Sequence, residues 1–171
     1  MIARVDRWDS LIQYHWQETS QQYALDAIAH WLLVKAIIAQ ESQFDPRARN
    51  DSSGATGLMQ VMPGALGTIE QLLDPDFNLH VGCAVLCDKW VIFKAEEGAE
   101  RWKFALGAYN GGQGDIIRAQ VLLTSRARPT NVWNEIASVL PQMKSAENAT
   151  QNIQYVRVVF THFLALRAAY G

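Results

Sequence analysis

The feature that most restricts the fold of this chain is the spacing of its apolar residues, which recur every three to four positions along most of the sequence. The alternation of apolar and polar residues that marks a half-buried strand is almost absent. Helical spacing places apolar side chains on one face of a helix, so the sequence predicts a mainly α-helical fold. The expected helices span residues 4–20, 25–42, 64–73, 78–96, 100–109, 115–124, 131–140 and 149–169.

The composition suits a single folding unit. The chain has 171 residues, of which 49% are hydrophobic and 19% are charged. This is enough to bury a sizeable core in one domain spanning residues 1–171, and no repeat, linker or low-complexity tract divides it. Local signals set the helix ends: Thr130 or Asn131 is expected to cap the helix over 131–140, and Pro141 to stop it.

The charge balance argues against a nucleic-acid partner. The formal net charge is −2 and the isoelectric point is near 6.1, whereas nucleic-acid-binding domains usually carry a basic surface. The densest basic group consists of Arg118, Arg126 and Arg128, which we expect to lie in a solvated loop.

The sequence also bears on location. Residues 1–20 contain neither the continuous apolar stretch nor the small-residue cleavage site of a secretory signal. The longest apolar run, over 31–39, is interrupted by Lys35 and is too short to cross a bilayer. We therefore expect synthesis in the cytoplasm without a signal peptide, and no stable membrane insertion. The apolar last helix could disturb a membrane, but packing in the core is the favoured interpretation.

One spacing resembles a metal site. His80, Cys83 and Cys87 would share one face of a helix and could supply three ligands, but no fourth ligand is identifiable. Buried thiols on a core stripe are commoner, so we expect no metal and no cofactor.

A carboxylate ends the most apolar helix. Glu41 lies four residues after Ile37 and seven after Val34, so it continues the stripe that also holds Ala27 and Trp31. Burial raises the pKa of a carboxyl group and keeps it protonated, as a general acid for a sugar oxygen requires. The alternative is that Glu41 reaches solvent and pairs with a nearby arginine. Spacing alone leaves both interpretations open.

Several segments around Glu41 occur in the order of a known family. They are Glu41-Ser42, FDPRA (44–48), GATGLMQVMP (54–63), FNLHVG (77–82) and ALGAYNGGQGDI (105–116), preceded by Tyr23, Leu25 and Asp26. Over residues 22–166 the chain resembles the soluble lytic transglycosylases and their goose-type lysozyme relatives, and residues 1–21 would be an N-terminal helical extension.

This resemblance implies a lysozyme-like fold that cleaves the β-1,4 bond between N-acetylmuramic acid and N-acetylglucosamine in peptidoglycan. Glu41 would be the catalytic acid, and a 1,6-anhydro ring would form on the muramic acid. Gln60 and Met59 would line the sugar groove, with Tyr109 and Asn110 on the opposite wall. The full set of substrate-binding residues that the resemblance implies is Ser42, Asp51, Ser52, Met59, Gln60, Tyr109, Asn110 and Tyr155.

Two departures from the family pattern affect this assignment. Ungapped counting places Asp51 where transglycosylases commonly have Ser and goose-type enzymes have Asp, and Ser52 could take the Ser role instead. Met62 stands where many goose-type enzymes have a second Asp, which favours a transglycosylase. Gln151 replaces a frequent Glu, and Glu147 lies one helical turn away.

Two other functions stay open. One is a goose-type hydrolytic lysozyme that uses Asp51 as its second carboxylate. The other is a non-catalytic glycan-binding or structural assembly protein. The expected partner is the glycan strand, bound by a monomer. Bacterial lysis by a phage endolysin-type enzyme, reaching the periplasm and cell wall through a holin-type pore or from a virion, is the expected setting.

Overall fold

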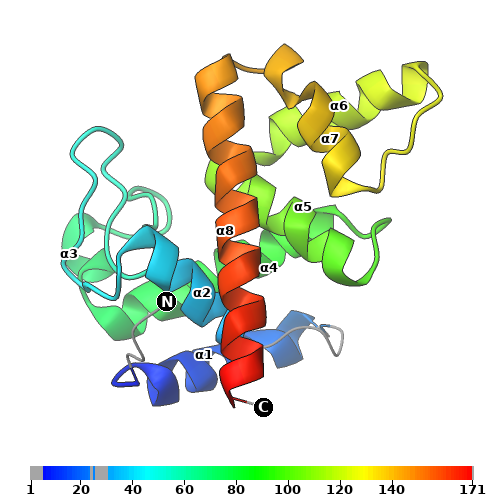
Figure 1. The fold of residues 1–171 in the computed structure, drawn as a ribbon. Coiled ribbons are helices and arrows are strands. Elements are labelled where there is room, and N and C mark those ends of the chain that lie inside the picture. Colours follow the sequence, from blue (N-terminus) through cyan, green and yellow to red (C-terminus); the bar gives the residue numbers. More distant parts are fainter. Residues whose placement is uncertain (1–5, 24, 26–30, 171) are drawn as a thin grey trace. The chain divides into compact units, whose positions relative to one another are not determined.

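The computed structural model describes residues 6–23, 25 and 31–170, and helices dominate these residues (Figure 1). The prediction of a mainly α-helical fold is confirmed. The chain divides into two compact units, one comprising the chain up to residue 85 and from residue 159, the other residues 86–158. The elements are α1 Asp9–Tyr23, α2 Trp31–Glu41, α3 Ile69–Leu72, α4 Pro75–Ile92, α5 Gly98–Gly111, α6 Gln113–Ser125, α7 Trp133–Val139, the 3₁₀ turn η1 Leu140–Gln142 and α8 Ala146–Tyr170.

The boundary between the units falls inside α4 and α8, and each unit is described by itself. The expectation that residues 1–171 form one folding domain stays a prediction.

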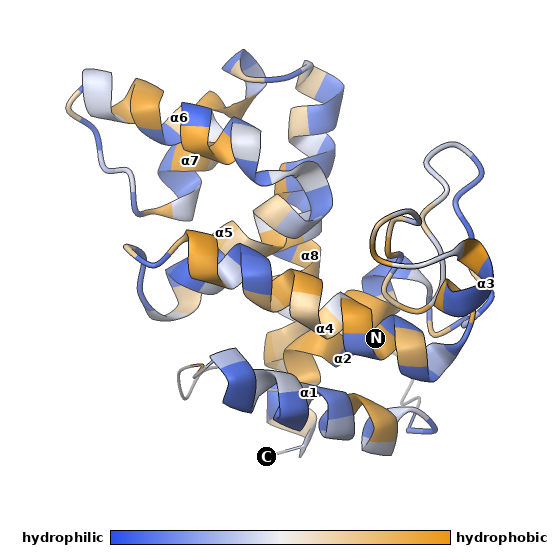
Figure 2. Cartoon of the chain, turned by 180° about the vertical axis from the view of Figure 1, so that it is seen from behind, coloured by the Kyte–Doolittle hydropathy of each residue, from blue (hydrophilic) through white to orange (hydrophobic). Residues whose placement is uncertain are grey.

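The core of the first unit is built around α2. Every side chain from Leu32 to Ile38 is buried, including that of Lys35. A helix that is apolar on all sides must be enclosed by its neighbours. Figure 2 shows this apolar character along α2 and the mixed character of α1, which buries Ile12 and Trp16.

The buried ammonium group of Lys35 is neutralised by its neighbours. Lys35 Nζ lies 2.5 Å from Asp9 Oδ1, 3.4 Å from Asp6 Oδ1 and 2.6 Å from the Tyr170 hydroxyl. Burial acts to lower the pKa of Lys35, but the hydrogen bonds and charges of Asp9 and Tyr170 outweigh it, and the pKa is raised above its ordinary value. This ionic cluster joins the start of α1, the middle of α2 and the end of α8.

The second unit packs α5, α6 and α7 around aromatic side chains. Phe104 lies between Phe93 and Trp133, with ring centroids 5.4 and 5.8 Å away. The first N–H of α7, that of Trp133, is accepted by Glu100 Oε2 of α5 at 2.6 Å. The predicted cap by Thr130 or Asn131 is wrong: the N-cap is Val132, whose side chain makes no cap hydrogen bond.

Other predicted boundaries also change. The helix expected over 64–73 is reduced to Ile69–Leu72, because Gly64 and Gly67 form an antiparallel bridge and Thr68 starts the helix with Gln71 in a reciprocal capping box. The first helix begins at Asp9 rather than at residue 4. Asp26 of the opening motif and Ala27 of the apolar stripe lie outside the described residues.

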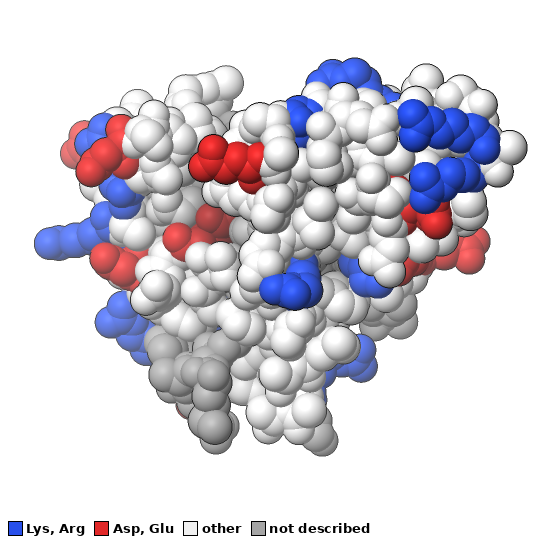
Figure 3. Space-filling view, turned by 45° about the horizontal axis from the view of Figure 1, so that its top comes forward, with Lys and Arg blue, Asp and Glu red and all other residues white. Residues whose placement is uncertain are grey.

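Charged side chains of both signs are interspersed on the face that Figure 3 shows. Of the three arginines singled out above, Arg118 pairs with Asp115 and Arg128 with Glu135. Within the described ranges, no helix combines the length and the apolar character needed to cross a membrane.

Candidate active site

Glu41 is the last residue of α2 and is half-buried, between fully buried Ile38 and the exposed Gln43. The next residue, Ser42, is buried, and its hydroxyl lies 2.8 Å from the Leu58 carbonyl and 3.2 Å from the Ile38 carbonyl. Ser42 therefore ties the end of α2 to the turn over residues 57–60. In this structure the Ser42 hydroxyl makes hydrogen bonds within the protein that join these two segments.

The backbone immediately after Glu41 is strained. Gln43 and Phe44 have φ values of 52° and 67°, a left-handed conformation that side-chain-bearing residues adopt at a cost of about 1–3 kcal/mol each. Phe44 is buried, and its carbonyl accepts hydrogen bonds from Arg7 Nη2 at 3.1 Å and Trp8 Nε1 at 3.3 Å. The residues that precede α1 thus hold the strained turn that directs the chain away from Glu41.

The turn over residues 57–60, which carries Gln60, is closed by antiparallel bridges that join Thr56 to Arg49 and to Val61. Gln60 has a φ of 49°, and its Nε2 donates to the carbonyls of Ala48 at 3.1 Å and Gly57 at 3.0 Å. Both amide hydrogens are therefore used inside the loop. The Gln60 side chain can offer a sugar only its carbonyl oxygen, as an acceptor for a hydroxyl or amide N–H.

Asn78 of α4 holds this turn by hydrogen bonds. It is fully buried; its Oδ1 accepts from the Met59 N–H at 2.8 Å, and its Nδ2 donates to the Thr56 and Leu72 carbonyls, both at 2.9 Å. A Cβ at Gly57 would lie 2.3 Å from Asn78 Nδ2, so only glycine permits this approach. We refer to Asn78 and Gly57, the pair with the lower residue numbers, as the lower clamp.

Met59 packs one helical turn further along α4. Its side chain is fully buried, and a Cβ at Gly82 would lie 2.4 Å from its Sδ. Asn78 and Gly82 are four residues apart and share one face of α4. In this structure Met59 anchors the turn over residues 57–60 to α4 and exposes no surface to a ligand.

Asp51 and Ser52 lie at the exposed tip of the loop over residues 50–54. Asn50 organises this tip, because its Oδ1 accepts from the N–H groups of Ser52 and Ser53, both at 3.0 Å, and from the Ser52 hydroxyl at 2.7 Å. The Ser52 hydroxyl is thus engaged within the loop, and the Asp51 carboxylate is exposed.

The remaining predicted residues belong to the second unit. Tyr109, which is half-buried, and Asn110, which is exposed, lie in the last turn of α5. Gly112 follows with a φ of 81°, and its N–H closes the helix on the Ala108 carbonyl at 3.0 Å. This left-handed glycine allows the chain to turn at once into α6.

Asn152 of α8 holds this turn in the second unit. It is buried, and its Nδ2 donates to the Gly107 carbonyl and to Asn110 Oδ1, both at 2.9 Å. A Cβ at Gly111 would lie 2.6 Å from Asn152 Nδ2 and 2.8 Å from Lys144 Nζ. We refer to Asn152 and Gly111, the pair with the higher residue numbers, as the upper clamp. Because Asn110 accepts this bond with its oxygen, its amide hydrogens are left to donate to a ligand.

Tyr155 lies three residues after Asn152 on α8 and is buried, with 5% of its surface exposed. Glu147 and Gln151, the residues that depart from the family pattern, are exposed on the same helix. Glu147 supplies a carboxylate one helical turn before Gln151, the position at which a Glu is frequent in the family pattern.

In the described part of the chain, no three His, Cys, Asp or Glu side chains are grouped so that they could hold a metal ion. Cys83 and Cys87 are both fully buried, whereas His80 is exposed. Burial, with a smaller contribution from Asp88, raises the pKa of the Cys87 thiol to about 12.

The sequence reasoning missed the residues that position the site. Asn78 and Gly82 belong to the segment FNLHVG (77–82). Their spacing of four residues, which places both on one face of a helix, was the available signal. Asn152 sits three residues before a predicted site tyrosine. Arg7 and Trp8 carried no signal, since nothing in the sequence indicates that they reach the Phe44 carbonyl.

Comparisons with known proteins identify the family of the chain. The family model described as "Transglycosylase SLT domain" matches residues 15–132. Membrane-bound lytic murein transglycosylase F of Desulfosudis oleivorans is 28% identical over 98% of this chain and 38% of its own length. The protein of the same name from Maricaulis maris is 32% identical over 74% of this chain and 28% of its own length.

Solved structures show the same fold and confirm the predicted lysozyme-like fold class. The 70 kDa soluble lytic transglycosylase of Escherichia coli matches with a TM-score of 0.70 and 23% identity, over 97% of this chain and 25% of that one. An inactive mutant of lytic transglycosylase Slt from Pseudomonas aeruginosa matches with a TM-score of 0.66 and 24% identity, over 93% of this chain and 24% of that one. The chain thus spans between 24% and 38% of the length of these proteins. Because the family model covers well over half of it, the chain belongs to the transglycosylase SLT domain family.

Proposed function

We propose that this chain is a peptidoglycan lytic transglycosylase in which Glu41 is the general acid and base. The observation that carries the proposal is the placement of Glu41, half-buried at the end of an apolar helix and followed by the strained residues Gln43 and Phe44. Strain that the surrounding structure maintains is typical of functional sites. The relatives named lytic murein transglycosylase support the same activity.

The reaction needs one carboxyl group. Glu41 donates its proton to the oxygen that bridges N-acetylmuramic acid and N-acetylglucosamine, and the bond from that oxygen to C1 of the muramic acid breaks. The C6 hydroxyl oxygen of the same muramic acid then bonds to C1, while its proton passes to the Glu41 carboxylate. A 1,6-anhydro ring forms, Glu41 regains its proton, and no water is consumed. Positioned acid–base catalysis of this kind contributes about 10²–10⁴-fold in rate.

The other site residues have complementary hydrogen-bonding roles in this proposal. Gln60 offers an acceptor, because its amide hydrogens are bound to Ala48 and Gly57. Asn110 offers donors, because its oxygen is bound to Asn152. A sugar that carries an acetamido group has both a donor N–H and an acceptor carbonyl. Tyr109 and Tyr155 are proposed to help position the sugar, and Ser42 and Met59 to support the loop.

Mass spectrometry of digested peptidoglycan tests the proposal. Soluble products lighter by one water than those of a hydrolase are expected. Glu41→Gln should abolish their release, a loss of about 10²–10⁴-fold, with an unchanged circular dichroism spectrum. Gln40→Glu in the Glu41→Gln background is the matched control, since it restores the charge one residue away and should not restore activity.

Two results would replace the proposal. Products with plain reducing ends, lost on Asp51→Asn, would identify a hydrolytic lysozyme that uses two carboxylates. Glycan binding without any cleavage by the native chain would identify a binding protein.

Endolysin-type delivery, through a holin-type pore or from a virion, is part of the proposal. Lysis of cells that express the chain only when a holin is co-expressed is the expected result, and lysis without it would exclude this route. A monomer is expected in light scattering.

A further inference from the structure

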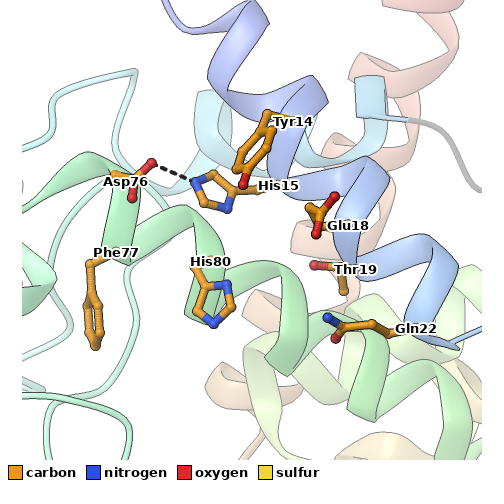
Figure 4. Close-up of a pocket in the computed structure, with 8 residues that line it drawn as sticks. All are labelled: Tyr14, His15, Glu18, Thr19, Gln22, Asp76, Phe77 and His80. Carbon is orange, nitrogen blue, oxygen red and sulfur yellow. Dashed lines mark hydrogen bonds and ion pairs between the residues drawn. The ribbon is translucent and has the colours of Figure 1, made fainter.

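The first unit contains a cavity that the proposed reaction does not use. It has a volume of about 320 Å³ and lies between α1 and the start of α4 (Figure 4). Pockets for small ligands begin at about 300 Å³, so this one has room for a single small ring. The side chains that line it are Tyr14, His15, Glu18, Thr19, Gln22, Asp76, Phe77 and His80.

The cavity is separate from the lower clamp. On α4, Asn78 and Gly82 face the turn over residues 57–60, whereas Asp76 and His80 line the cavity. A residue two positions along a helix is rotated by about 200°, so His80 points to the side opposite Asn78. None of the lining residues belongs to the proposed catalytic site.

The walls of the cavity are held in place by His15. This side chain is 4% exposed, and its Nε2 lies 3.0 Å from Asp76 Oδ1, which joins α1 to α4. Its ring also meets those of Tyr14 and His80, edge to face, at centroid distances of 5.1 and 6.0 Å. One oxygen of Asp76 is thereby fixed, and the other is available to a ligand.

The lining selects a ligand by its hydrogen bonds rather than by its charge. None of the described residues that line the cavity is a lysine or arginine, and of the two carboxylates among them Asp76 already has a partner. Carboxylate, amide, hydroxyl and imidazole groups together accept and donate around the wall. Tyr14 adds an aromatic ring that is 58% exposed. A neutral hexose ring matches this set, since it carries several hydroxyl groups around an edge and C–H groups on its faces.

We propose that this cavity is a second saccharide site, which takes one neutral hexose unit while another part of the chain carries out the cleavage. Glu18 and Asp76 accept from hydroxyl groups, Gln22 and His80 complete the hydrogen bonds, and Tyr14 packs against a face of the ring. The choice of N-acetylglucosamine as the hexose, but not the existence of the site, rests on the proposed function.

Nuclear magnetic resonance of the ¹⁵N-labelled Glu41→Gln chain tests this site. Titration with the N-acetylglucosamine trimer should shift the amide signals of Tyr14, Glu18 and His80, with a dissociation constant on the order of 1 mM. Glu18→Ala and Tyr14→Ala should each weaken this binding by about tenfold. Gln17→Ala, an exposed position on α1 outside the lining, is the control and should leave it unchanged.

Three outcomes would overturn the inference. They are trimer-induced shifts confined to residues 41–62, shifts at α1 that survive both variants, and shifts at α1 caused by lysine methyl ester but not by the sugar. Glu18→Gln, which keeps the shape of the side chain, replaces Glu18→Ala if circular dichroism shows that Glu18→Ala has lost its fold. If the trimer does not shift the amide signals of α1 while the native chain releases anhydro products, only this second site is refuted. If the native chain releases no anhydro products, the proposed function fails, whatever the result at the cavity.

Discussion

The two clamps of the molecule use the same residue types, an asparagine and a glycine, but the two asparagines differ in how many of their hydrogen-bonding groups have partners. In the lower clamp, Asn78 makes three hydrogen bonds and lies against Gly57; in the upper clamp, Asn152 makes two and lies against Gly111. The Oδ1 of Asn152 is buried without a partner among the described residues. The lower clamp is therefore expected to act mainly on stability, and the upper clamp mainly on the orientation of Asn110.

The largest expected effect is at the lower clamp. Asn78→Ala would leave the Met59 N–H and the Leu72 carbonyl without the Asn78 side chain, and the Thr56 carbonyl with the Val61 N–H alone. It should lower the free energy of unfolding by about 4 kcal/mol. Urea denaturation of the variant measures this loss. Asn148→Ala, an exposed position, is the control. A loss below about 1 kcal/mol would show that the lower clamp is not a stability element.

The next largest effect on the free energy of unfolding is expected at the ionic cluster around Lys35. It shows whether a buried ion pair stabilises the first unit as strongly as the Asn78 side-chain amide does. Lys35→Met would leave Asp9 without its closest cation, and should lower the free energy of unfolding by about 3 kcal/mol. Thermal denaturation at pH 7 measures this loss.

The same cluster predicts a pH dependence. The pKa of Lys35 in the folded chain is raised above its ordinary value of 10.5, so its contribution to stability is complete below that value and is lost as the pH rises through the folded pKa. The pKa of Tyr170 is also raised, by burial first and by Asp6, which acts in the same direction. Stability should therefore fall above about pH 10, and this fall should be smaller in Lys35→Met. An equal fall in both would contradict the assignment.

The upper clamp should affect catalysis more than folding. Asn152→Ala should lower the free energy of unfolding by about 1–2 kcal/mol, and kcat/KM should decrease because Asn110 loses its orientation. Asn110→Ala and the double variant complete a cycle. If Asn152 acts through Asn110, the two losses in kcat/KM will not add; additive losses would indicate a purely structural role.

The smallest effect concerns the strain after Glu41. Gln43→Gly should raise the free energy of unfolding by about 0.5–1 kcal/mol, because glycine adopts positive φ without strain, while lowering activity. Ala127→Gly is a matched control, since Ala127 also has a φ of 52° but lies outside the site. It should stabilise without changing activity. Equal activity of Gln43→Gly and Ala127→Gly would show that the strain at Gln43 has no role in function.

The helices were predictable because their signal is local. The stripe through Val34, Ile37 and Glu41 correctly located the helix that ends at the candidate acid. The cap of α7 was not predictable, since its acceptor is Glu100, more than thirty positions away in sequence. The short α3 follows from Thr68 and Gln71, a capping signal present in the sequence that periodicity alone overlooked.

The candidate site was also predictable only in part. Resemblance named Glu41, Gln60 and Asn110, whose roles stay predictions. It did not indicate which atoms remain available to a sugar, because that depends on tertiary hydrogen bonds: the amide hydrogens of Gln60 are bound in the loop, and the oxygen of Asn110 is bound to Asn152.

The Tyr170 hydroxyl, 2.6 Å from Lys35 Nζ, links the last turn of α8 to the middle of α2. Two stretches of chain more than a hundred residues apart are thus bound at one buried ammonium group. A displacement of the last turn of α8 would therefore be felt first at Lys35, on the same helix that ends at Glu41.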